Sequence, residues 1–154
     1  ASRVNVRWMV RADLPACERT ELGSFAEPWA GGQFLARLRL RNGIGLVATS
    51  RWDDAVLGHV VYTLHRDHLT LDRLAVAPRV RLCGVGRALL ERLQHKAVTH
   101  RRERVEAVVP EENVPAQVWL RACGWRAIDL TDDGIVFAWP APAVRWPTPD
   151  LTQD

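Results

Sequence analysis

The sequence of 154 residues predicts an α/β fold, in which short strands and helices follow one another along the chain. Three observations support this prediction. An apolar strand pattern over 69–76 runs through a turn into the strongest helical pattern of the chain, over 85–100. Two alternating segments, 44–49 and 55–65, flank a turn as paired strands do. Near the end, a further hairpin pattern surrounds the turn Asp132-Asp133-Gly134.

Local signals predict the elements before the first hairpin. Residues 5–10 are expected to form a strand. A helix is expected next, with Asp13 as its N-cap and Pro15 in its first turn. A loop over 24–32, which contains a proline and a pair of glycines, then leads to a short helix over 33–39.

The second half of the chain gives equally local signals. A short β-branched run, 104–109, predicts a strand. A helix is expected over 113–123, with Asn113 as its N-cap and Gly124 at its end. The last two strands are expected at 125–130 and 135–139. The chain is therefore predicted to form a single domain over 1–139, followed by a proline-rich tail over 140–154.

Composition restricts the class of protein. No apolar run approaches the roughly 20 residues that span a membrane, so no membrane partner is expected. The three cysteines are widely spaced, which favours free thiols and a cytoplasmic location over a disulfide framework. The ligand spacings of a zinc site are missing, so no metal is expected. A net charge of +3 is too small to indicate nucleic-acid binding.

A glycine-rich turn joins the strand at 69–76 to the long helix. Arg81 begins the pattern Arg-x-x-Gly-x-Gly, which ends with Gly84 and Gly86. Glycines let the backbone approach a ligand, and the unpaired N–H groups at a helix start suit a phosphate. Arg81 and Arg87 add charge that can bind phosphate oxygens. The turn matches neither a dinucleotide fingerprint nor a P-loop, and on its own it is equally well explained as an ordinary helix start.

A second motif follows about 30 residues later, with Asn113 and Ala116 before a short helix that ends in Gly124-Trp125. Together with Val76-Ala77-Pro78 and the glycine-rich turn, it resembles the GCN5-related N-acetyltransferase (GNAT) superfamily, which binds acetyl-CoA. The N-terminal region, with Asp13-Leu14-Pro15, Glu21 and the segment 24–29, is most similar to the ribosomal-protein-alanine N-acetyltransferase group. The resemblance covers about residues 4–139.

The resemblance implies a fold and a cofactor site. The fold would be a mixed, mostly antiparallel sheet of about six to seven strands with about four helices. Its sheet would be splayed between the strands ending near Val76 and Val109. The residues that would bind acetyl-CoA are Leu74, Ala75, Val76, Arg81, Leu82, Cys83, Gly84, Val85, Gly86, Arg87 and Asn113.

The catalytic residues are harder to assign, because the superfamily's acid position is Leu120 and the group's base position is Val108. Glu106 would share a strand face with Val108, and Glu112 lies in the following loop. Each could act as the base through a water molecule, or could be an ordinary surface charge. Asp72, on the strand that would hold the cofactor, is a weaker candidate for the base.

The acceptor groove is expected to contain Phe25 and Trp29, although aromatic packing of the helix–loop–helix explains both equally well. The leading hypothesis is transfer of an acetyl group from acetyl-CoA to a primary amine, such as a protein or peptide N-terminus, by direct attack. One alternative is a small-molecule amine as acceptor. The other is a CoA-binding or interaction module with little catalysis, because the usual acid and base are missing.

Overall fold

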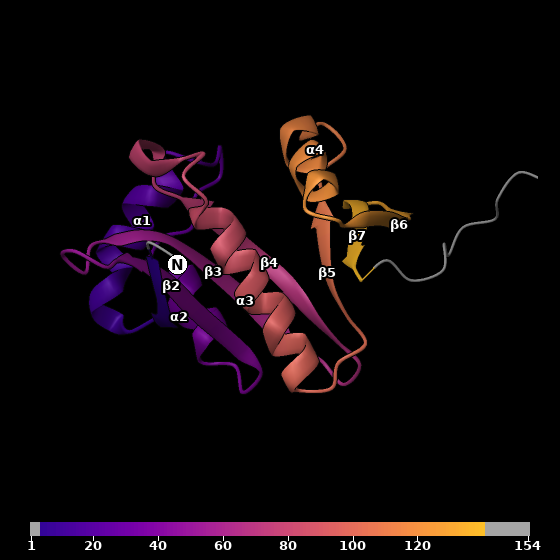
Figure 1. Ribbon diagram of the computed structural model, residues 1–154, viewed down its shortest axis with the longest axis horizontal. Coiled ribbons are helices and arrows are strands. Elements are labelled where there is room, and N and C mark those ends of the chain that lie inside the picture. Colours follow the sequence, from indigo (N-terminus) through magenta and orange to yellow (C-terminus); the bar gives the residue numbers. More distant parts are fainter. Residues whose placement is uncertain (1–3, 141–154) are drawn as a thin grey trace, which may run out of the picture.

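The computed structural model describes residues 4–140 (Figure 1). Each predicted helix and strand is present, with ends that differ by at most about two residues from the prediction. The elements in chain order are β1 Val4–Trp8, α1 Leu14–Leu22, α2 Gly31–Leu38, β2 Gly43–Ser50, β3 Val56–Leu64, β4 His68–Val76, α3 Val85–Thr99, β5 Arg104–Val109, α4 Val114–Ala122, β6 Arg126–Thr131 and β7 Gly134–Trp139. Two short 3₁₀ helices, Arg11–Asp13 and Pro78–Val80, were not predicted.

The seven strands form one mixed sheet with the order β1-β2-β3-β4-β5-β7-β6. Every neighbouring pair is antiparallel except β4 and β5, which are parallel. A parallel pair needs a long crossover connection, and α3 supplies it. This architecture confirms the mixed, mostly antiparallel sheet that the resemblance implies.

Helices cover both faces of the sheet, and strand alternation assigns the side chains to each face. In β2, Leu46 and Ala48 belong to the core beneath α3 and α4, whereas Val47 between them packs with α1 and α2. Figure 1 shows α3 lying across β2, β3 and β4. Its contacts extend from β1 to β5, so one helix supports most of the sheet.

The sheet opens between β4 and β5, as predicted. Their register pairs run only from His68–Arg104 to Leu71–Ala107. The last residues of β4, Leu74 to Val76, pair with β3 but not with β5. Figure 1 shows the two strands diverging toward α4. This divergence leaves space at the carboxyl ends of both strands.

Local predictions at the helix ends had mixed outcomes. The Asn113 side chain accepts a hydrogen bond from the N–H of Ala116 at 3.3 Å, as predicted for an N-cap. Asp13 stands at the N-cap position of α1, as predicted, but its side chain makes no capping hydrogen bond to that helix. Its carboxylate instead accepts hydrogen bonds from Arg7 (2.8 and 2.9 Å) and from the N–H of Val10 (2.8 Å), because the chain folds β1 against this turn.

Within residues 4–140, no helix is long and apolar enough to cross a membrane. Of the predicted tail, only Pro140 belongs to the described residues.

Candidate active site

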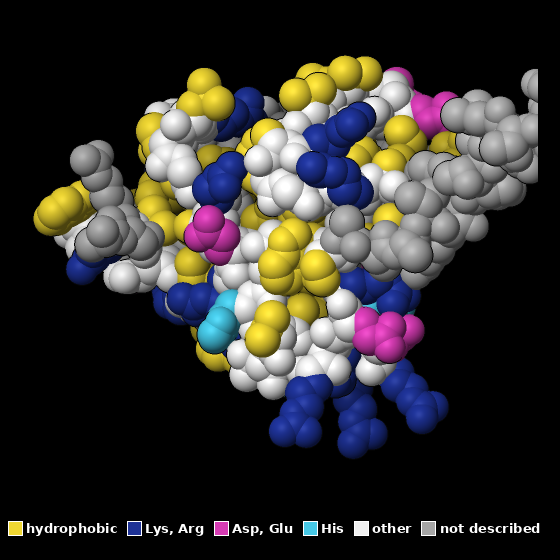
Figure 2. All heavy atoms as spheres, turned by 45° about the vertical axis from the view of Figure 1, so that its right-hand side comes forward, with side chains coloured by type: hydrophobic (Ala, Val, Ile, Leu, Met, Phe, Trp, Pro, Cys, Tyr) yellow, Lys and Arg dark blue, Asp and Glu magenta, His cyan; other side chains and the backbone are white. Residues whose placement is uncertain are grey.

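A first cavity of about 540 Å³ lies where the glycine-rich turn enters α3. It contains most of the residues predicted to bind the cofactor, while Ala75, Cys83 and Asn113 are not part of its lining. The residues that line it are Leu74, Val76, Arg81, Leu82, Gly84, Val85, Gly86, Arg87, Ala116 and Trp119. On the face shown in Figure 2, hydrophobic side chains gather through the middle of the molecule with basic side chains around them.

The backbone of the turn is shaped to leave the start of α3 open. Gly84 has a φ of +86°, and a Cβ added there would meet no atom within 4 Å. Gly86 is close to its neighbours, because an added Cβ would lie 3.3 Å from the Trp119 ring and 3.4 Å from Val76. The first N–H groups of a helix have no intrahelical partner, so they suit an anionic group at this opening.

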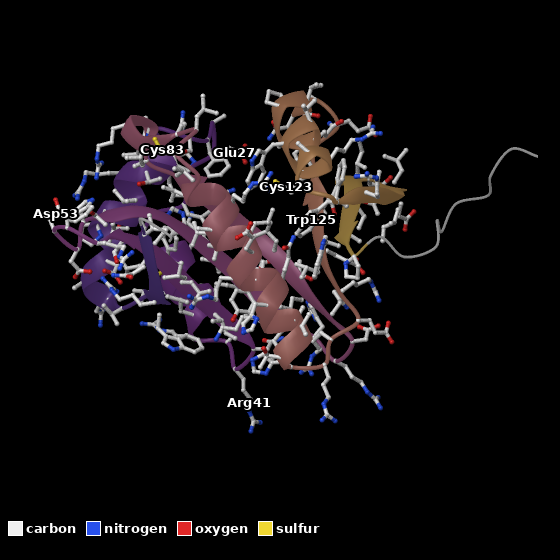
Figure 3. All side chains as sticks on the ribbon, viewed as in Figure 1. Glu27, Arg41, Asp53, Cys83, Cys123 and Trp125 are labelled. Atoms are coloured by element: carbon white, nitrogen blue, oxygen red, sulfur yellow. The ribbon has the colours of Figure 1, made fainter. Side chains whose placement is uncertain are left out.

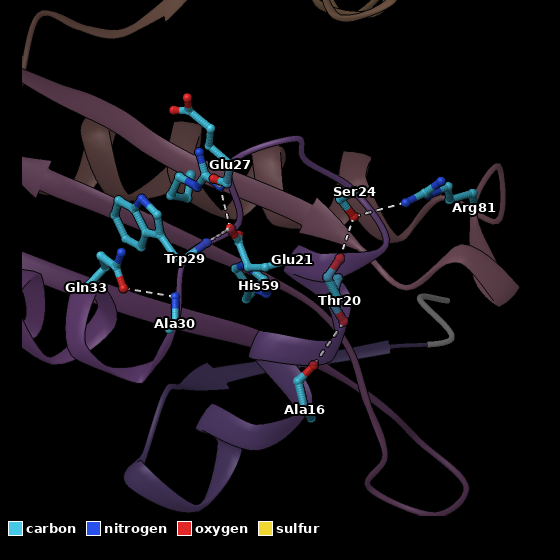
Figure 4. A network of polar contacts seen from close by, with 11 residues as sticks. Ala16, Thr20, Glu21, Ser24, Glu27, Trp29, Ala30, Gln33, His59 and Arg81 are labelled. Atoms are coloured by element: carbon cyan, nitrogen blue, oxygen red, sulfur yellow. Dashed lines mark hydrogen bonds and ion pairs between the residues drawn. The ribbon is translucent and has the colours of Figure 1, made fainter.

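The two arginines of the turn are in different situations. The Arg81 guanidinium donates hydrogen bonds to the carbonyl of Gly23 and to Ser24 Oγ, both at 2.9 Å (Figure 4). It also donates to the carbonyl of Val76 at 3.3 Å, so it ties the end of β4 to the loop after α1. Arg87 is exposed, and among residues 4–140 no hydrogen bond or ion pair engages it. Arg87 is therefore the freer of the two to bind a phosphate.

A second cavity of about 290 Å³ occupies the opening between β4 and β5. It shares Leu74, Ala116 and Trp119 with the first cavity, so the two adjoin. Its other lining residues are Phe25, Leu71, Asp72, Arg73, Ala107, Val108, Val109, Pro110, Asn113 and Leu120. The predicted acceptor residue Phe25 and both positions of the missing acid and base therefore lie at one cavity.

A β-bulge in β4 determines which polar side chains reach this cavity. Leu71 lies opposite Tyr62 and Arg73 lies opposite Val61, so Asp72 is the extra residue between them. The Asp72 carboxylate accepts a hydrogen bond from Thr63 Oγ1 at 2.6 Å and lies 3.5 Å from the Arg37 guanidinium. Burial raises the pKa of Asp72, and Thr63 and Arg37 oppose this effect only in part.

Beside the bulge, Glu21 is fully buried at the centre of a polar cluster (Figure 4). Its carboxylate is hydrogen-bonded to His59 Nε2 and to the N–H of Trp29, both at 2.8 Å, and it forms an ion pair with Arg73. Burial raises the pKa of Glu21, but the hydrogen bonds from His59, Arg73 and Trp29 outweigh this and hold the pKa below its ordinary value. Glu21 therefore remains ionised inside the protein.

Arg73 connects this cluster to the loop after α1. Its guanidinium lies 3.9 Å from the ring centre of Phe25 and 5.1 Å from that of Trp29. It also donates a hydrogen bond to the carbonyl of Glu27 at 3.3 Å. Cation–π contacts of this kind hold aromatic rings in place. Phe25 reaches the second cavity, whereas Trp29 packs edge-on against Phe34 and does not line it.

The structure does not bring the two predicted catalytic glutamates into either cavity. Glu106 is in an ion pair with Arg104 on the same strand. Glu112 is exposed in the loop before α4. Tyr62, the single tyrosine of the chain, lies in the core beneath α3, where burial raises its pKa to about 12. None of these side chains lines the second cavity.

Sequence reasoning missed Arg73 and the β-bulge at Asp72. The signal was the spacing of apolar residues in β4, where Leu69 and Leu71 alternate and the next apolar residue, Leu74, comes three positions later. A spacing of three instead of two indicates one extra residue in a strand. Among residues 4–140, no group of three or more His, Cys, Asp or Glu side chains could hold a metal ion.

Comparisons with known proteins agree with this geometry. A sequence model described as the acetyltransferase (GNAT) family matches residues 8–125. A comparison with curated protein sequences found no match.

Several solved structures share the fold. The ribosomal-protein-S18-alanine N-acetyltransferase from Escherichia coli is 22% identical with a TM-score of 0.76, and the alignment covers 96% of this chain and 98% of that chain. Nourseothricin acetyltransferase is 20% identical with a TM-score of 0.70, covering 92% and 100%. The PaiA N-acetyltransferase from Thermoplasma acidophilum, solved with coenzyme A, is 13% identical with a TM-score of 0.70, covering 88% and 97%.

Proposed function

The chain belongs to the GNAT acetyltransferase family, an acyltransferase family that uses acetyl-CoA, and on this premise we propose that it acetylates a protein or peptide N-terminus. The observation that supports this proposal most directly is the pair of adjoining cavities at the opening of the sheet. One can hold acetyl-CoA and the other can hold an amine. Both substrates can then meet at β4 in a ternary complex, as direct transfer requires.

We assign the first cavity to acetyl-CoA. The N–H groups from Leu82 to Arg87 would bind the pyrophosphate, and the Arg87 side chain would add a charge-assisted contact. The backbone of Leu74, Ala75 and Val76 would hold the pantetheine arm and the acetyl carbonyl, because β5 does not pair with this part of β4. Asn113 lines the second cavity, where its amide can reach the same arm. The N–H groups of this site favour negative charge on the carbonyl oxygen during transfer.

The assignment of the acceptor rests on the N-terminal region and on Phe25. The segment 24–29 belongs to the region that resembles the ribosomal-protein-alanine group. The ion pair of Glu21 with Arg73, and the contact of Arg73 with Phe25, hold this segment beside the second cavity. The alternative acceptor, a small-molecule amine, is supported by the apolar side chains at Val108 and Leu120. A cytoplasmic location remains part of the proposal, and the free state of all three cysteines agrees with it.

The cofactor assignment can be tested by thermal unfolding in the presence of acetyl-CoA. Binding to the folded state raises the melting temperature with ligand concentration. Gly84→Trp should lose this increase, because the new side chain enters the open space of the first cavity. Gly84→Ala is the matched control, because it carries the same positive-φ strain without the bulk. It should melt at a lower temperature and keep the increase.

The acceptor can be tested by measuring CoA release with two sets of amines. One set contains hexapeptides with different N-terminal residues, and the other contains polyamines and aminoglycosides. Turnover with the peptides alone supports the proposed function. Turnover with the small amines alone supports the alternative, and CoA binding without turnover by either set supports a binding module.

A further inference from the structure

The second cavity contains one carboxylate, that of Asp72, and its ion-pair partner Arg37 is partly exposed, with 35% of the Arg37 side chain accessible. Asp72 and Arg73 are the charged residues of its lining. Arg73 is occupied by Glu21, which is itself fully buried and saturated with partners. Asp72 therefore supplies the negative charge of this lining, and its contact with Arg37 at 3.5 Å is longer than that of Glu21 with Arg73. The rest of the lining is mainly apolar, so this charge acts at reduced dielectric constant.

The register of the sheet places Asp72 beside the position where the family resemblance predicts a base. Leu71 and Ala107 form the last pair between β4 and β5. Asp72 and Val108 are the next residues on the two strands, and both line the second cavity. A carboxylate on β4 can thus reach the same part of the cavity that a carboxylate at position 108 of β5 would reach. At the bulge, the successive charged residues Asp72 and Arg73 both line this cavity.

The surroundings of Asp72 hold the carboxylate in place and keep it mostly buried, with 12% of its side chain exposed. On β3, Thr63 donates its hydroxyl, and His65 at the end of that strand adds a weaker electrostatic influence. From α2, Arg37 lies 3.5 Å away. On β5, Glu106 is neutralised by Arg104, so it adds little competing charge. Burial is the largest influence on Asp72 and raises its pKa toward the range useful for a base.

We propose that Asp72 is the catalytic base that accepts the proton of the attacking amine; this inference rests on the proposed acetyl transfer. The amine nitrogen forms a bond to the acetyl carbon and loses one proton to the Asp72 carboxylate. The carbon–sulfur bond breaks, and its electron pair leaves with sulfur as the CoA thiolate. The thiolate then takes up a proton from Asp72 or from water. Asp72 returns to its ionised form, and no metal or redox partner is required.

The test compares Asp72→Asn with the unmodified protein across a range of pH. The acceptor is the best substrate among the peptides and amines described above. Asparagine keeps the shape and can still accept from Thr63, so the fold should be retained. We expect kcat/KM for the amine to fall about 100-fold or more, as for loss of a general base, with unchanged acetyl-CoA binding. The inflection at low pH should disappear from the profile, and Asp72→Glu should restore part of the rate.

Asp53→Asn is the matched control, because it removes the same charge at the turn between β2 and β3, far from the opening (Figure 3). It should leave rate and profile unchanged. If Asp72→Asn keeps normal kcat/KM, or if Glu106→Gln or Glu112→Gln removes the low-pH inflection instead, the proposal is overturned.

A second measurement needs no acceptor and separates this inference from the proposed function. Carboxyl ¹³C shifts of the protein saturated with acetyl-CoA can be followed against pH, with Asp72→Asn identifying the signal. A pKa above the ordinary aspartate value of about 3.9 supports the assignment. A pKa at or below that value overturns it, whether or not an acceptor has been found.

Discussion

Glu21 is a buried carboxylate, and three hydrogen-bond donors stabilise its charge. They are His59 of β3, Arg73 of β4 and the N–H of Trp29 in the loop after α1. Removing one partner of a buried ion pair leaves the other charge unsatisfied, which costs more than the pair itself contributes. The same residue holds Arg73, and through it Phe25, at the second cavity. Stability and the geometry of the second cavity are therefore coupled at this residue.

Glu21→Gln should lower the free energy of unfolding by about 3 kcal/mol at pH 7. The folded pKa of Glu21 lies below its unfolded value, so its stabilisation is present above about pH 4.3 and is lost as pH falls through the folded pKa. The difference between the two proteins should shrink by pH 3. Urea unfolding at both pH values measures it, with the exposed Glu91→Gln as control. A pH-independent difference would contradict the ionised state of Glu21.

Arg87 and Arg81 should respond differently to removal. Arg87→Ala should weaken acetyl-CoA binding about 10- to 100-fold, the range for a charge-assisted hydrogen bond, and leave the melting temperature of the free protein unchanged. Arg81→Ala should lower that melting temperature, because Arg81 joins β4 to residues Gly23 and Ser24. Calorimetric titration and thermal unfolding of both variants distinguish these roles. The same loss of affinity with no loss of stability in Arg81→Ala would show that Arg81 also acts mainly on the ligand.

At the scale of elements, α4 begins at the edge of the second cavity, and its N-cap is itself a lining residue. The Asn113 side chain accepts from the N–H of Ala116 and also lines the second cavity, from which its amide could reach the pantetheine arm. A serine can cap a helix about as well as an asparagine, but it lacks the amide. The two roles of Asn113 can therefore be separated by substitution.

Asn113→Ser should keep the stability of the protein and weaken acetyl-CoA binding, whereas Asn113→Ala should also cost about 1 kcal/mol of stability. Chemical unfolding gives the first quantity and calorimetric titration the second. If Asn113→Ser binds acetyl-CoA normally, Asn113 is a capping residue only.

At the scale of the whole molecule, the sheet consists of two parts joined by the short parallel pairing of β4 and β5. β1 to β4 pair along most of their lengths, and β5, β7 and β6 form the other part. A ligand bound in the opening would contact both parts. It should therefore add protection to the backbone at the junction more than elsewhere.

Hydrogen exchange should show this effect directly. Acetyl-CoA should slow exchange in the last residues of β4, in the turn over 82–87 and at the start of α4, and leave β1 and β2 unchanged. Mass spectrometry of exchanged peptides, with and without acetyl-CoA, gives the comparison. Uniform protection of the whole chain would point to general stabilisation without a site at the opening.

Basic side chains also lie away from the two cavities. Figure 2 shows a group of Lys and Arg side chains projecting from the lower edge, and Figure 3 places Arg41 at that edge, remote from Cys83 of the glycine-rich turn. Positive charge is thus not confined to the first cavity. The first cavity depends on the backbone of the turn and on a few arginines.

Sequence alone determined the helices and strands of this protein, because their signals are local. The alternation in β2, the glycines before α3 and the cap at Asn113 each act within a few residues. The two motifs also indicated the acetyl-CoA family through their order and spacing, and the opening of the sheet followed from that resemblance.

Only the tertiary structure decided which polar side chains occupy the opening. Glu21, His59 and Arg73 come from three elements, and no local pattern pairs them. Arg73 follows Asp72 directly and still pairs with Glu21 of α1, because one extra residue in β4 changes the direction of every side chain after it. The Asp13 carboxylate likewise binds the Arg7 side chain of β1 and makes no hydrogen bond to its own helix, α1. These pairings depend on long-range packing, because a buried charge is stable only next to a partner, and that partner comes from a distant part of the chain.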